Sequence, residues 1–283
     1  MTTAPFMNSR GLESLGIVPE TLLIPLAARM IAQDRHPDLQ FRDSEASRIG
    51  AALGFDPARF AGDTGSMRGS VIRAQWFDRI TETFITSHPS GLCVSIGSGL
   101  DDRPARIRLP ATLDWIDADF ANVVRLRDTL IARRANVRTL TVMETEPLAW
   151  MDGINWVPER PVLVLAEGVS MYLAPALGED LVRGLVERAG RNRASIELAA
   201  DFASPVMVRH SRRNPSIAKT RASFLWAVAR PEAVGEIAPG LALVEADDIT
   251  RRCGAVAWTM ATVHRLLTGR PVYFCGHYRY RPS

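Results

Sequence analysis

A pair of glycines follows the first strand-like apolar run of the chain. Leu92–Ile96 has the composition of a buried strand, and Gly97 and Gly99 come directly after it, on either side of Ser98. A glycine turn at the carboxyl end of a strand lets a ligand approach the backbone closely, and in an open parallel sheet the ligand crevice lies at that end. The pattern therefore predicts a ligand-binding loop, although a plain tight turn would produce the same spacing.

An acidic residue ends the next apolar run. Asp119 stands where a carboxylate would hold a ribose diol, and it could also cap the helix predicted after it. A dinucleotide-binding turn would need a third glycine at position 102, where Asp102 would repel a pyrophosphate. A glycine turn with a ribose acid and no phosphate signature favours a nucleoside without a pyrophosphate, such as S-adenosylmethionine.

Two further acids follow apolar runs. Glu144 comes after Val137–Met143, and Glu167 comes directly after Pro161–Ala166, the most apolar run of the chain. A charge at the end of a buried strand is usually paired or functional. We therefore expect Glu167 to belong to the site, and for Glu144 a functional role and an exposed strand-end charge are equally compatible with the sequence.

The elements that must position these residues alternate between strands and helices. Strands that are apolar on both faces, with helices between them, predict a doubly wound α/β fold whose seven-stranded, mostly parallel sheet is covered on both sides. The predicted strands are 92–96, 112–118, 137–143, 161–166, 193–199, 241–246 and 271–280, and the predicted helices between and after them are 121–134, 175–189, 216–228 and 253–267.

The first ninety residues show helical periodicity without the strand-like apolar runs of the rest of the chain. Helical periodicity over 21–33, 43–53 and 66–86 predicts a helical cap within residues 1–90 that contributes to the pocket. Residues 91–283 would then form the α/β core, with a lid-like insertion at about 203–234. We expect this insertion and the cap to select the substrate.

Composition excludes several classes of protein. The chain has 283 residues, 47% of them hydrophobic, and a net charge of +3 that is scattered rather than clustered, so we expect no nucleic-acid partner. No run reaches the roughly 18 apolar residues of a membrane helix, and the amino-terminal segment does not read as a secretion signal, so we expect no membrane partner. Separated cysteines at 93, 253 and 275 predict free thiols, no metal site and a cytoplasmic protein.

The same residues resemble motifs of a known family. Residues 96–103 read IGSGLDDR, similar to the LGAGLDTR motif of the leucine carboxyl methyltransferase family, and residues 115–123 read WIDADFANV, similar to its aromatic-x-EVDLPxV motif. The EGxxxYL motif is intact at 167–173, and an RGxxxR motif resembles 68–73. These motifs occur in family order, and they are most similar to the bacterial branch that contains tetracenomycin-type polyketide O-methyltransferases.

The resemblance implies a role for each motif residue. Arg68 would grip the methionine carboxylate of S-adenosylmethionine, Gly97, Ser98 and Gly99 would line its turn, and Asp119 would hold its ribose. Glu144 and Thr145 would lie near the adenine, and Glu167 would face the methionine amino group or the sulfonium. Arg73 and Tyr172 would border the acceptor. Departures from the family pattern stand at residues 102, 117, 121 and 144.

The implied activity is methyl transfer from S-adenosylmethionine to a carboxylate or phenolic oxygen of a small molecule such as a polyketide. Tyr172 is the one candidate catalytic residue, since His210 and His264 qualify only by residue type. Two alternatives remain at this stage: an NAD(P)-dependent oxidoreductase, which would use the glycine turn and Asp119, and a protein that binds S-adenosylmethionine without turnover. The sequence does not indicate the oligomeric state.

Overall fold

A single seven-stranded sheet organises the protein. The computed structural model describes residues 20–220 and 222–282, and its strand order is β3-β2-β1-β4-β5-β7-β6. Every neighbouring pair is parallel except the two that involve β7, which runs antiparallel to both β5 and β6. The predicted mostly parallel sheet is thus confirmed. The strands are β1 Leu92–Ile96, β2 Asp114–Phe120, β3 Val137–Val142, β4 Val162–Ala166, β5 Ile196–Ala203, β6 Ala242–Asp248 and β7 Tyr273–Tyr280.

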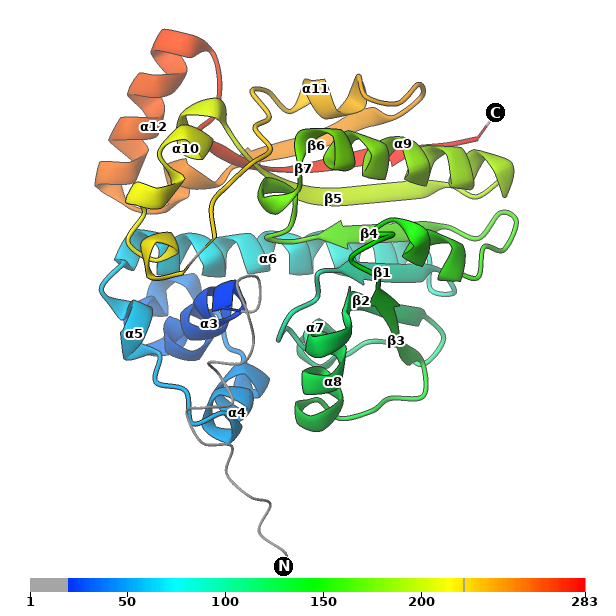
Figure 1. The fold of residues 1–283 in the computed structure, drawn as a ribbon, viewed down its shortest axis with the longest axis horizontal. Helices are drawn as coiled ribbons and strands as arrows, with labels where there is room; N and C mark the ends of the chain where they lie inside the picture. Colours follow the sequence, from blue (N-terminus) through cyan, green and yellow to red (C-terminus); the bar gives the residue numbers. More distant parts are fainter. Residues whose placement is uncertain (1–19, 221, 283) are drawn as a thin grey trace, which may run out of the picture.

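Helices surround this sheet, and the longest of them lies along one face (Figure 1). Short 3₁₀ turns occupy several connections, among them η4 Ser211–Arg213 and η5 Ile217–Lys219. Residues 1–19, where the predicted cap begins, lie outside the described part of the chain. The α-helices are α3 Leu23–Arg35, α4 Ser44–Ala52, α5 Ala58–Ala61, α6 Thr64–Ser87, α7 Arg103–Arg106, α8 Ala121–Leu130, α9 Pro175–Arg191, α10 Pro205–Arg209, α11 Glu232–Gly235 and α12 Ala255–Thr268.

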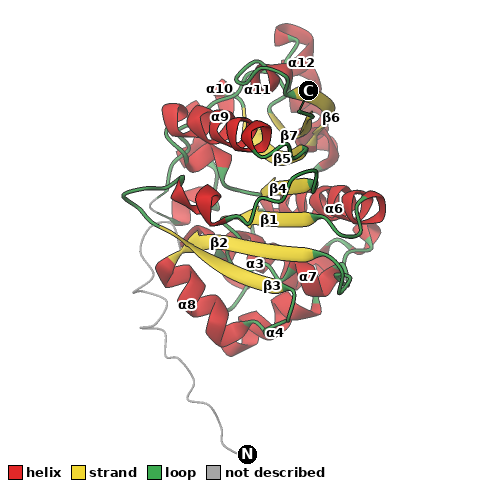
Figure 2. Ribbon diagram, turned by 90° about the vertical axis from the view of Figure 1, so that its right-hand side faces the viewer, coloured by secondary structure: helices red, strands yellow, loops and turns green. Residues whose placement is uncertain are grey.

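Alternation along the central strands gives the sheet two apolar faces. Val94 of β1 and Val164 of β4 pack in one cluster with α9, whereas Cys93 and Leu163 pack in another with α6. The edge-on view shows α6 and α9 on opposite sides of the sheet (Figure 2). Such two-sided burial requires strands that are apolar at every position, which is why β1 and β4 read so clearly in the sequence.

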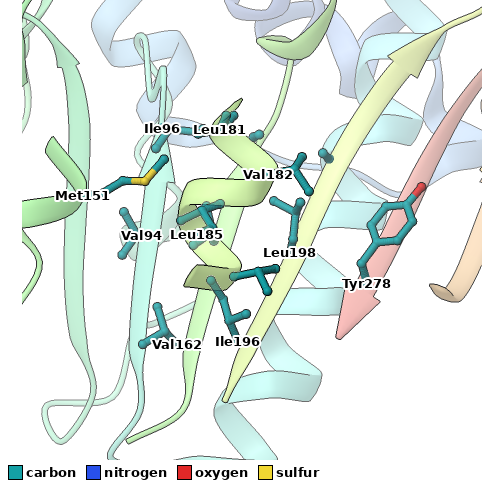
Figure 3. Close-up of a cluster of buried hydrophobic side chains, with 14 of the residues drawn as sticks. Val94, Ile96, Met151, Val162, Leu181, Val182, Leu185, Ile196, Leu198 and Tyr278 are labelled. Carbon is teal, nitrogen blue, oxygen red and sulfur yellow. The ribbon is translucent and has the colours of Figure 1, made fainter. Parts of the chain in front are cut away.

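The cluster under α9 is the largest part of the core. Leu181 and Leu185 of α9 lie against Val94 and Ile196 of the sheet, as the close-up shows (Figure 3). The spacing of four residues puts both leucines on one face of the helix. Because this cluster contains residues of β1, β4 and β5, it fixes the relative positions of the ends of β1 and β4, which Gly97 and Glu167 follow.

The amino-terminal helices form a layer of their own over α6. Residues of α3, α4 and α5 share a buried cluster with Met67 and Val71 of α6. Asp43 caps α4 by accepting a hydrogen bond from the Ala46 backbone N–H at 2.9 Å. α6 itself packs on the sheet through Trp76 and Phe77, so one helix belongs to both layers.

One predicted element is wrong. The helix expected over residues 216–228 is a short turn, η5, followed by an extended segment whose Ala227 bridges to Ala203 of β5. Burial alternates along this segment: four apolar residues are buried and the residues between them are more exposed. That period of two is the signature of an extended chain rather than a helix. The four buried residues are Ala222, Phe224, Trp226 and Val228.

The segment that leads to this strand-like stretch is fastened to the cap. The Lys219 ammonium donates to the Arg59 carbonyl, and the Arg59 guanidinium donates back to the Lys219 carbonyl at 3.4 Å. The same ammonium lies 5.7 Å from the centre of the Phe60 ring. Residues 205–219 therefore have a defined position beside α5 and the start of α6.

A pair of glycine substitutions in α9 tests this packing. A Cβ at Gly178 would lie 2.3 Å from the Trp226 ring, whereas a Cβ at Gly184 would first meet, at 3.3 Å, the flexible end of Arg188. We expect Gly178→Ala to lower the free energy of unfolding by roughly 1–3 kcal/mol because a packed ring must move. Gly184→Ala should be neutral or raise it by up to about 1 kcal/mol, through helix propensity. Urea unfolding measures both, and equal effects of the two substitutions would contradict the extended course of residues 222–228.

Candidate active site

A large cavity opens at the carboxyl ends of β1 and β4. Its volume is about 720 Å³, and it is lined by residues 97–101 of the glycine loop, by Glu167 and Gly168, and by Ser66, Gly69 and Arg73 of α6. Eight of the residues between Val206 and Ile217 and three residues of α12 line the same space. The crevice therefore lies where the strand order of a parallel sheet predicts a ligand.

The glycine loop is held rigidly by its neighbours. Gly97 and Gly99 have φ values of 59° and 53°, in the left-handed region that favours glycine. The Gly97 N–H donates to the Ala118 carbonyl, and the buried Arg127 guanidinium donates to the carbonyls of Gly99 at 2.7 Å and Asp101 at 2.9 Å. The loop is thus preorganised by hydrogen bonds from β2 and α8.

Asp119 is a further support of this loop. One carboxylate oxygen accepts from the Gly99 N–H and the other from the Phe120 N–H, both at 2.8 Å. Burial raises the pKa of Asp119, and these two hydrogen bonds oppose that effect. The side chain does not itself line the cavity, so its contact with a ribose stays a prediction.

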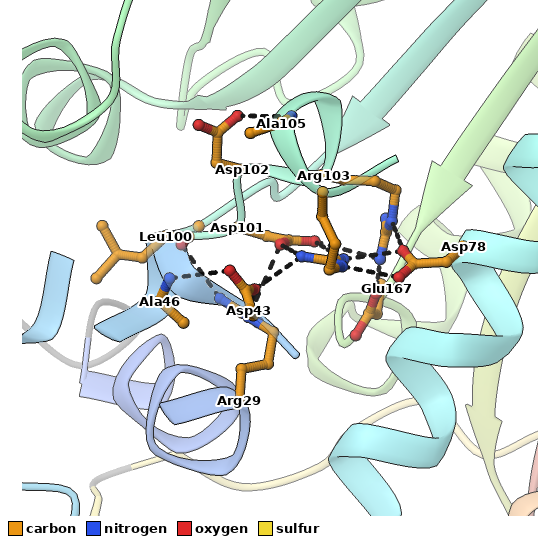
Figure 4. A network of polar contacts seen from close by, with 12 residues as sticks. Arg29, Asp43, Ala46, Asp78, Leu100, Asp101, Asp102, Arg103, Ala105 and Glu167 are labelled. Carbon is orange, nitrogen blue, oxygen red and sulfur yellow. Dashed lines mark hydrogen bonds and ion pairs between the residues drawn. The ribbon is translucent and has the colours of Figure 1, made fainter. Parts of the chain in front are cut away.

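Asp102 does not act as the sequence suggested. Its carboxylate accepts from the Ala105 N–H at the start of α7 (Figure 4) and also forms an ion pair with Arg134 at 3.0 Å. It is nearly inaccessible and does not line the cavity. The charge of Asp102 is therefore not what would exclude a pyrophosphate from this site.

Glu167 lies in a buried network of arginines and carboxylates. It pairs with Arg73 at 3.0 Å and also with Arg103, while Asp101 pairs with Arg106 at 2.6 Å and Arg103 at 3.2 Å. Figure 4 shows how this network converges from several elements. The remaining members are Arg29 and Asp43 from the cap side and Asp78 from α6.

Arg73 is the centre of the deep end of this network. Its guanidinium also reaches the buried Asp201 at 3.2 Å and the Tyr273 hydroxyl at 3.0 Å. Burial lowers the pKa of Arg73, but the surrounding Tyr273, Asp201 and Glu167 outweigh it and keep the group protonated. For the acid Asp201 burial has the opposite effect and raises the pKa, and the positive charge of Arg73 opposes this rise. Most of the Arg73 guanidinium is thus occupied within the protein.

Besides Asp119, three more predicted cofactor residues lie outside the cavity. Arg68 is not among the residues that line it, and its guanidinium makes a two-pronged ion pair with Asp38, at 2.9 and 2.6 Å. Glu144 and Thr145 are exposed in the turn after β3. The structure therefore brings together Gly97, Ser98, Gly99, Arg73, Glu167 and Tyr172, but not these three, whose roles stay predictions.

Tyr172 borders the cavity beside Phe224, and the two rings meet edge-on with centres 5.3 Å apart. Burial raises the pKa of Tyr172 to about 12. At neutral pH the phenol is therefore protonated and can donate a hydrogen bond, but it is a poor proton acceptor.

Both candidate histidines line the cavity. His210 Nδ1 lies 2.9 Å from the Val206 carbonyl oxygen, and since a carbonyl only accepts, Nδ1 carries the proton when the ring is neutral. His210 Nε2 is then left as a hydrogen-bond acceptor. His264 reaches the same cavity from α12.

The sequence analysis does not identify several residues of the site. Asp201 lies beyond the predicted strand 193–199, but β5 continues to Ala203 and brings the Asp201 carboxylate to Arg73. Its signal, a lone acid within an apolar run, is the one that identified Glu167. Tyr273, Arg103 and Arg127 carry no comparable signal, because only the folded chain shows which arginines are buried.

Comparison with known proteins decides the family. The family model described as leucine carboxyl methyltransferase matches residues 19–186. The tetracenomycin polyketide synthesis O-methyltransferase TcmP of Streptomyces glaucescens is 30% identical over 256 residues, which cover 90% of this chain and 87% of that protein. This chain belongs to the leucine carboxyl methyltransferase family.

Other relatives agree with this membership. The S-adenosyl-L-methionine-dependent methyltransferase dpfgK of Gibberella zeae is 27% identical over 246 residues, 82% of each chain. A solved methyltransferase-like structure from Thermobifida fusca has a TM-score of 0.58 at 12% identity and covers 96% of this chain and 98% of that one. The fold is that of class I methyltransferases, and the protein is an S-adenosylmethionine-dependent methyltransferase, as the resemblance predicted.

The residues at the glycine loop suit that cofactor. Ser98 lines the cavity, and its buried hydroxyl has no hydrogen-bond partner among the described residues. A buried hydroxyl without a partner is costly unless a ligand satisfies it.

Within the ranges 20–220 and 222–282, no group of side chains could hold a metal ion, and no helix has the length and hydropathy to cross a membrane.

Substitutions at Arg68 and Arg73 test which arginine serves the cofactor. We expect Arg68→Ala to change the dissociation constant for S-adenosylhomocysteine by less than about twofold, because Arg68 lies outside the cavity. Arg73→Lys keeps the charge but loses the planar guanidinium, and it should weaken binding by about tenfold as Glu167 and Asp201 lose their shared donor. Isothermal titration calorimetry gives both constants, with thermal unfolding as the control for folding. A large loss with Arg68→Ala at an unchanged melting temperature would restore Arg68 as the carboxylate ligand.

Proposed function

We propose that the protein transfers the methyl group of S-adenosylmethionine to a carboxylate or phenolic oxygen of an apolar small molecule such as a polyketide. One observation carries the proposal: a mostly apolar cavity of about 720 Å³ adjoins the glycine loop in a chain 30% identical, over 90% of its length, to a polyketide O-methyltransferase. The oxidoreductase alternative loses its support because the glycine turn and Asp119 occur here in a chain that belongs to a methyltransferase family.

In this proposal the cofactor lies on the glycine loop. The Ser98 hydroxyl and the backbone of Gly97 and Gly99 contact it, Asp119 holds the ribose through its remaining lone pairs, and Glu167 faces the cationic end. Glu144 and Thr145 would have to approach the adenine by a change in the turn after β3. Because Glu167 is fixed by two arginines, its carboxylate is available in one orientation only.

The acceptor would lie between the loop and the segments above it. The cap contributes Leu22 and Ile24 to the cavity, and the 203–234 insertion contributes Met207, Ile217 and Phe224. Apolar walls of this kind exclude water and align the acceptor oxygen, and alignment alone can be worth roughly 7–11 kcal/mol in favourable cases. We propose that these two segments select the acceptor.

The cofactor supplies an already activated methyl group, so the protein's own chemistry is limited to positioning and to handling one proton. A carboxylate acceptor is ionised at neutral pH and needs no base. A phenolic acceptor would release a proton, and His210 Nε2 is a suitable acceptor because Nδ1 is held by the Val206 carbonyl. Tyr172 would orient the acceptor as a hydrogen-bond donor.

The protein's compartment is part of the same proposal. Cys93 and Cys275 are buried and Cys253 is partly buried, and none of the three forms a disulfide in the described structure. Free thiols of this kind are typical of a reducing compartment. We propose that the protein acts in the cytoplasm on a small-molecule substrate.

Cofactor titration followed by a turnover assay tests the proposed activity. We expect S-adenosylmethionine and S-adenosylhomocysteine to bind in calorimetry and NADH not to bind, and we expect radiolabelled methyl to appear on at least one member of a panel of aromatic acids and phenols. Binding without transfer to any panel member would favour a non-catalytic S-adenosylmethionine-binding protein. Binding of NADH alone would refute the proposal.

Asp119→Ala tests the arrangement of the cofactor within this proposal. It should weaken binding of S-adenosylhomocysteine by roughly 1–3 kcal/mol, the cost of leaving buried partners unpaired. Asp114→Ala, at the exposed start of the same strand, is the matched control and should have no effect. An unchanged affinity in folded Asp119→Ala protein would show that the ribose is held elsewhere.

A further inference from the structure

The charged side chains that line the cavity fall into two groups. Most are bonded within the protein: Arg29, Arg73, Asp101, Arg103 and Glu167 through the buried network, and Asp63 through Ser66 and Ser216. Arg213 is the exception. In the described part of the chain its guanidinium has neither a hydrogen-bond nor an ion-pair partner, although it lines the same cavity.

Arg213 has a fixed place at the open end of this cavity. The Ser211 hydroxyl accepts from the Phe224 N–H at 3.3 Å, and the Asn214 amide donates to the Ser66 hydroxyl at 2.8 Å. The backbone is therefore tied on both sides of Arg213. Its side chain is exposed, whereas the side chain of Glu167 is only 12% exposed, so Arg213 belongs to the solvent-exposed part of the cavity lining and Glu167 to its buried part.

The nearest acid on the cavity wall, Asp63, is held by Ser66 and Ser216, and the segments that carry and face Arg213 have no acid of their own. Residues 204–230 and 249–283 contain no aspartate or glutamate, and these stretches supply α10, η4 and α12, which border the opening. Arg209 and Arg212 nearby are exposed and likewise have no ion-pair partner among the described residues. An uncompensated cluster of arginines attracts anions, and a guanidinium matches the geometry of a carboxylate or phosphate.

Between this basic rim and the glycine loop the walls are apolar. Met207, Ile217 and Met260 line the cavity together with the edge-on pair of Tyr172 and Phe224. A ligand that fills this space must have an apolar body, and aromatic walls favour a flat one. The middle of the cavity is therefore suited to an apolar group. Among the described residues that line it, Arg213 is the charged side chain that no partner occupies.

We propose that Arg213 binds an anionic substituent of the acceptor, distinct from the oxygen that is methylated, and so selects flat apolar acids over neutral molecules of the same shape. This proposal rests on the proposed function, because it requires the methyl group to be delivered at the glycine loop. The receiving oxygen lies at the inner end of the cavity, and the anionic substituent stays at the rim. The rim arginines also favour the approach of such a molecule.

Two probes that differ by one carboxylate test this assignment. We would titrate the protein, already saturated with S-adenosylhomocysteine, in a calorimeter with 6-hydroxy-2-naphthoate, which carries its hydroxyl and carboxylate at opposite ends of a flat ring system, and separately with 2-naphthol. We expect the naphthoate to bind about tenfold or more tightly than the naphthol, the usual size of one charge-assisted hydrogen bond. Arg213→Gln should abolish this preference and leave the affinity for S-adenosylhomocysteine within about twofold of wild type.

Arg212→Gln is the matched control, because Arg212 is exposed in the same turn but does not line the cavity. It should keep the preference for the naphthoate. Equal affinity of the two probes for the wild-type complex, binding of neither probe, or an equal loss with Arg212→Gln would overturn the proposal. A loss of S-adenosylhomocysteine affinity with Arg213→Gln would assign Arg213 to the cofactor instead. Failure of the wild-type protein to bind S-adenosylhomocysteine would refute the proposed function itself, a result distinct from all of these.

Discussion

The pairing of Glu167 with Arg73 and Arg103 is the interaction on which the rest of the site depends. It joins the end of β4 to α6 and to the glycine loop, and through Arg103 and Arg106 it extends to Asp78, Asp101 and the capped start of α4. Buried ion pairs add little net stability, but the removal of one member leaves an uncompensated charge in a medium of low dielectric constant. The network therefore admits few alternative arrangements, and it fixes the cap, the loop and the sheet relative to one another.

The arginines and carboxylates of this network neutralise one another, and this limits what the buried floor of the cavity, formed by Arg73, Arg103 and Glu167, can recognise. Arginines that already hold carboxylates have few donors left for a ligand, so anion recognition at the floor is weak although the floor is rich in charge. Under the proposed function, discrimination among acceptors would then depend on the apolar walls and the rim of the cavity. Substitutions in residues 203–234 could change the acceptor without disturbing the buried network.

The sequence predicted the parts of this arrangement that depend on local patterns. The predicted bounds of β1 match the structure at both ends, and those of β4 differ by one residue at one end, because buried parallel strands are apolar at every position. The choice between Arg68 and Arg73 could not be predicted. Five residues apart on a helix, they point about 140° from each other, and only the packing of α6 on the sheet decides which one faces the cavity. The helix predicted over residues 216–228 is wrong because the spacing of their apolar residues also fits a helix. Contact with β5 instead keeps residues 222–228 extended.

The contact of Lys219 with Arg59 and Phe60 has a practical consequence, because Lys219 is the only lysine in the chain. An amine-reactive fluorophore would modify one side chain, at the joint between η5 and the short helix α5. A label at that joint would report whether the two segments separate when a small molecule enters or leaves, without any engineered cysteine. Conversely, lysine-directed crosslinking would be nearly uninformative for this protein, and distance mapping would have to rely on its carboxylates.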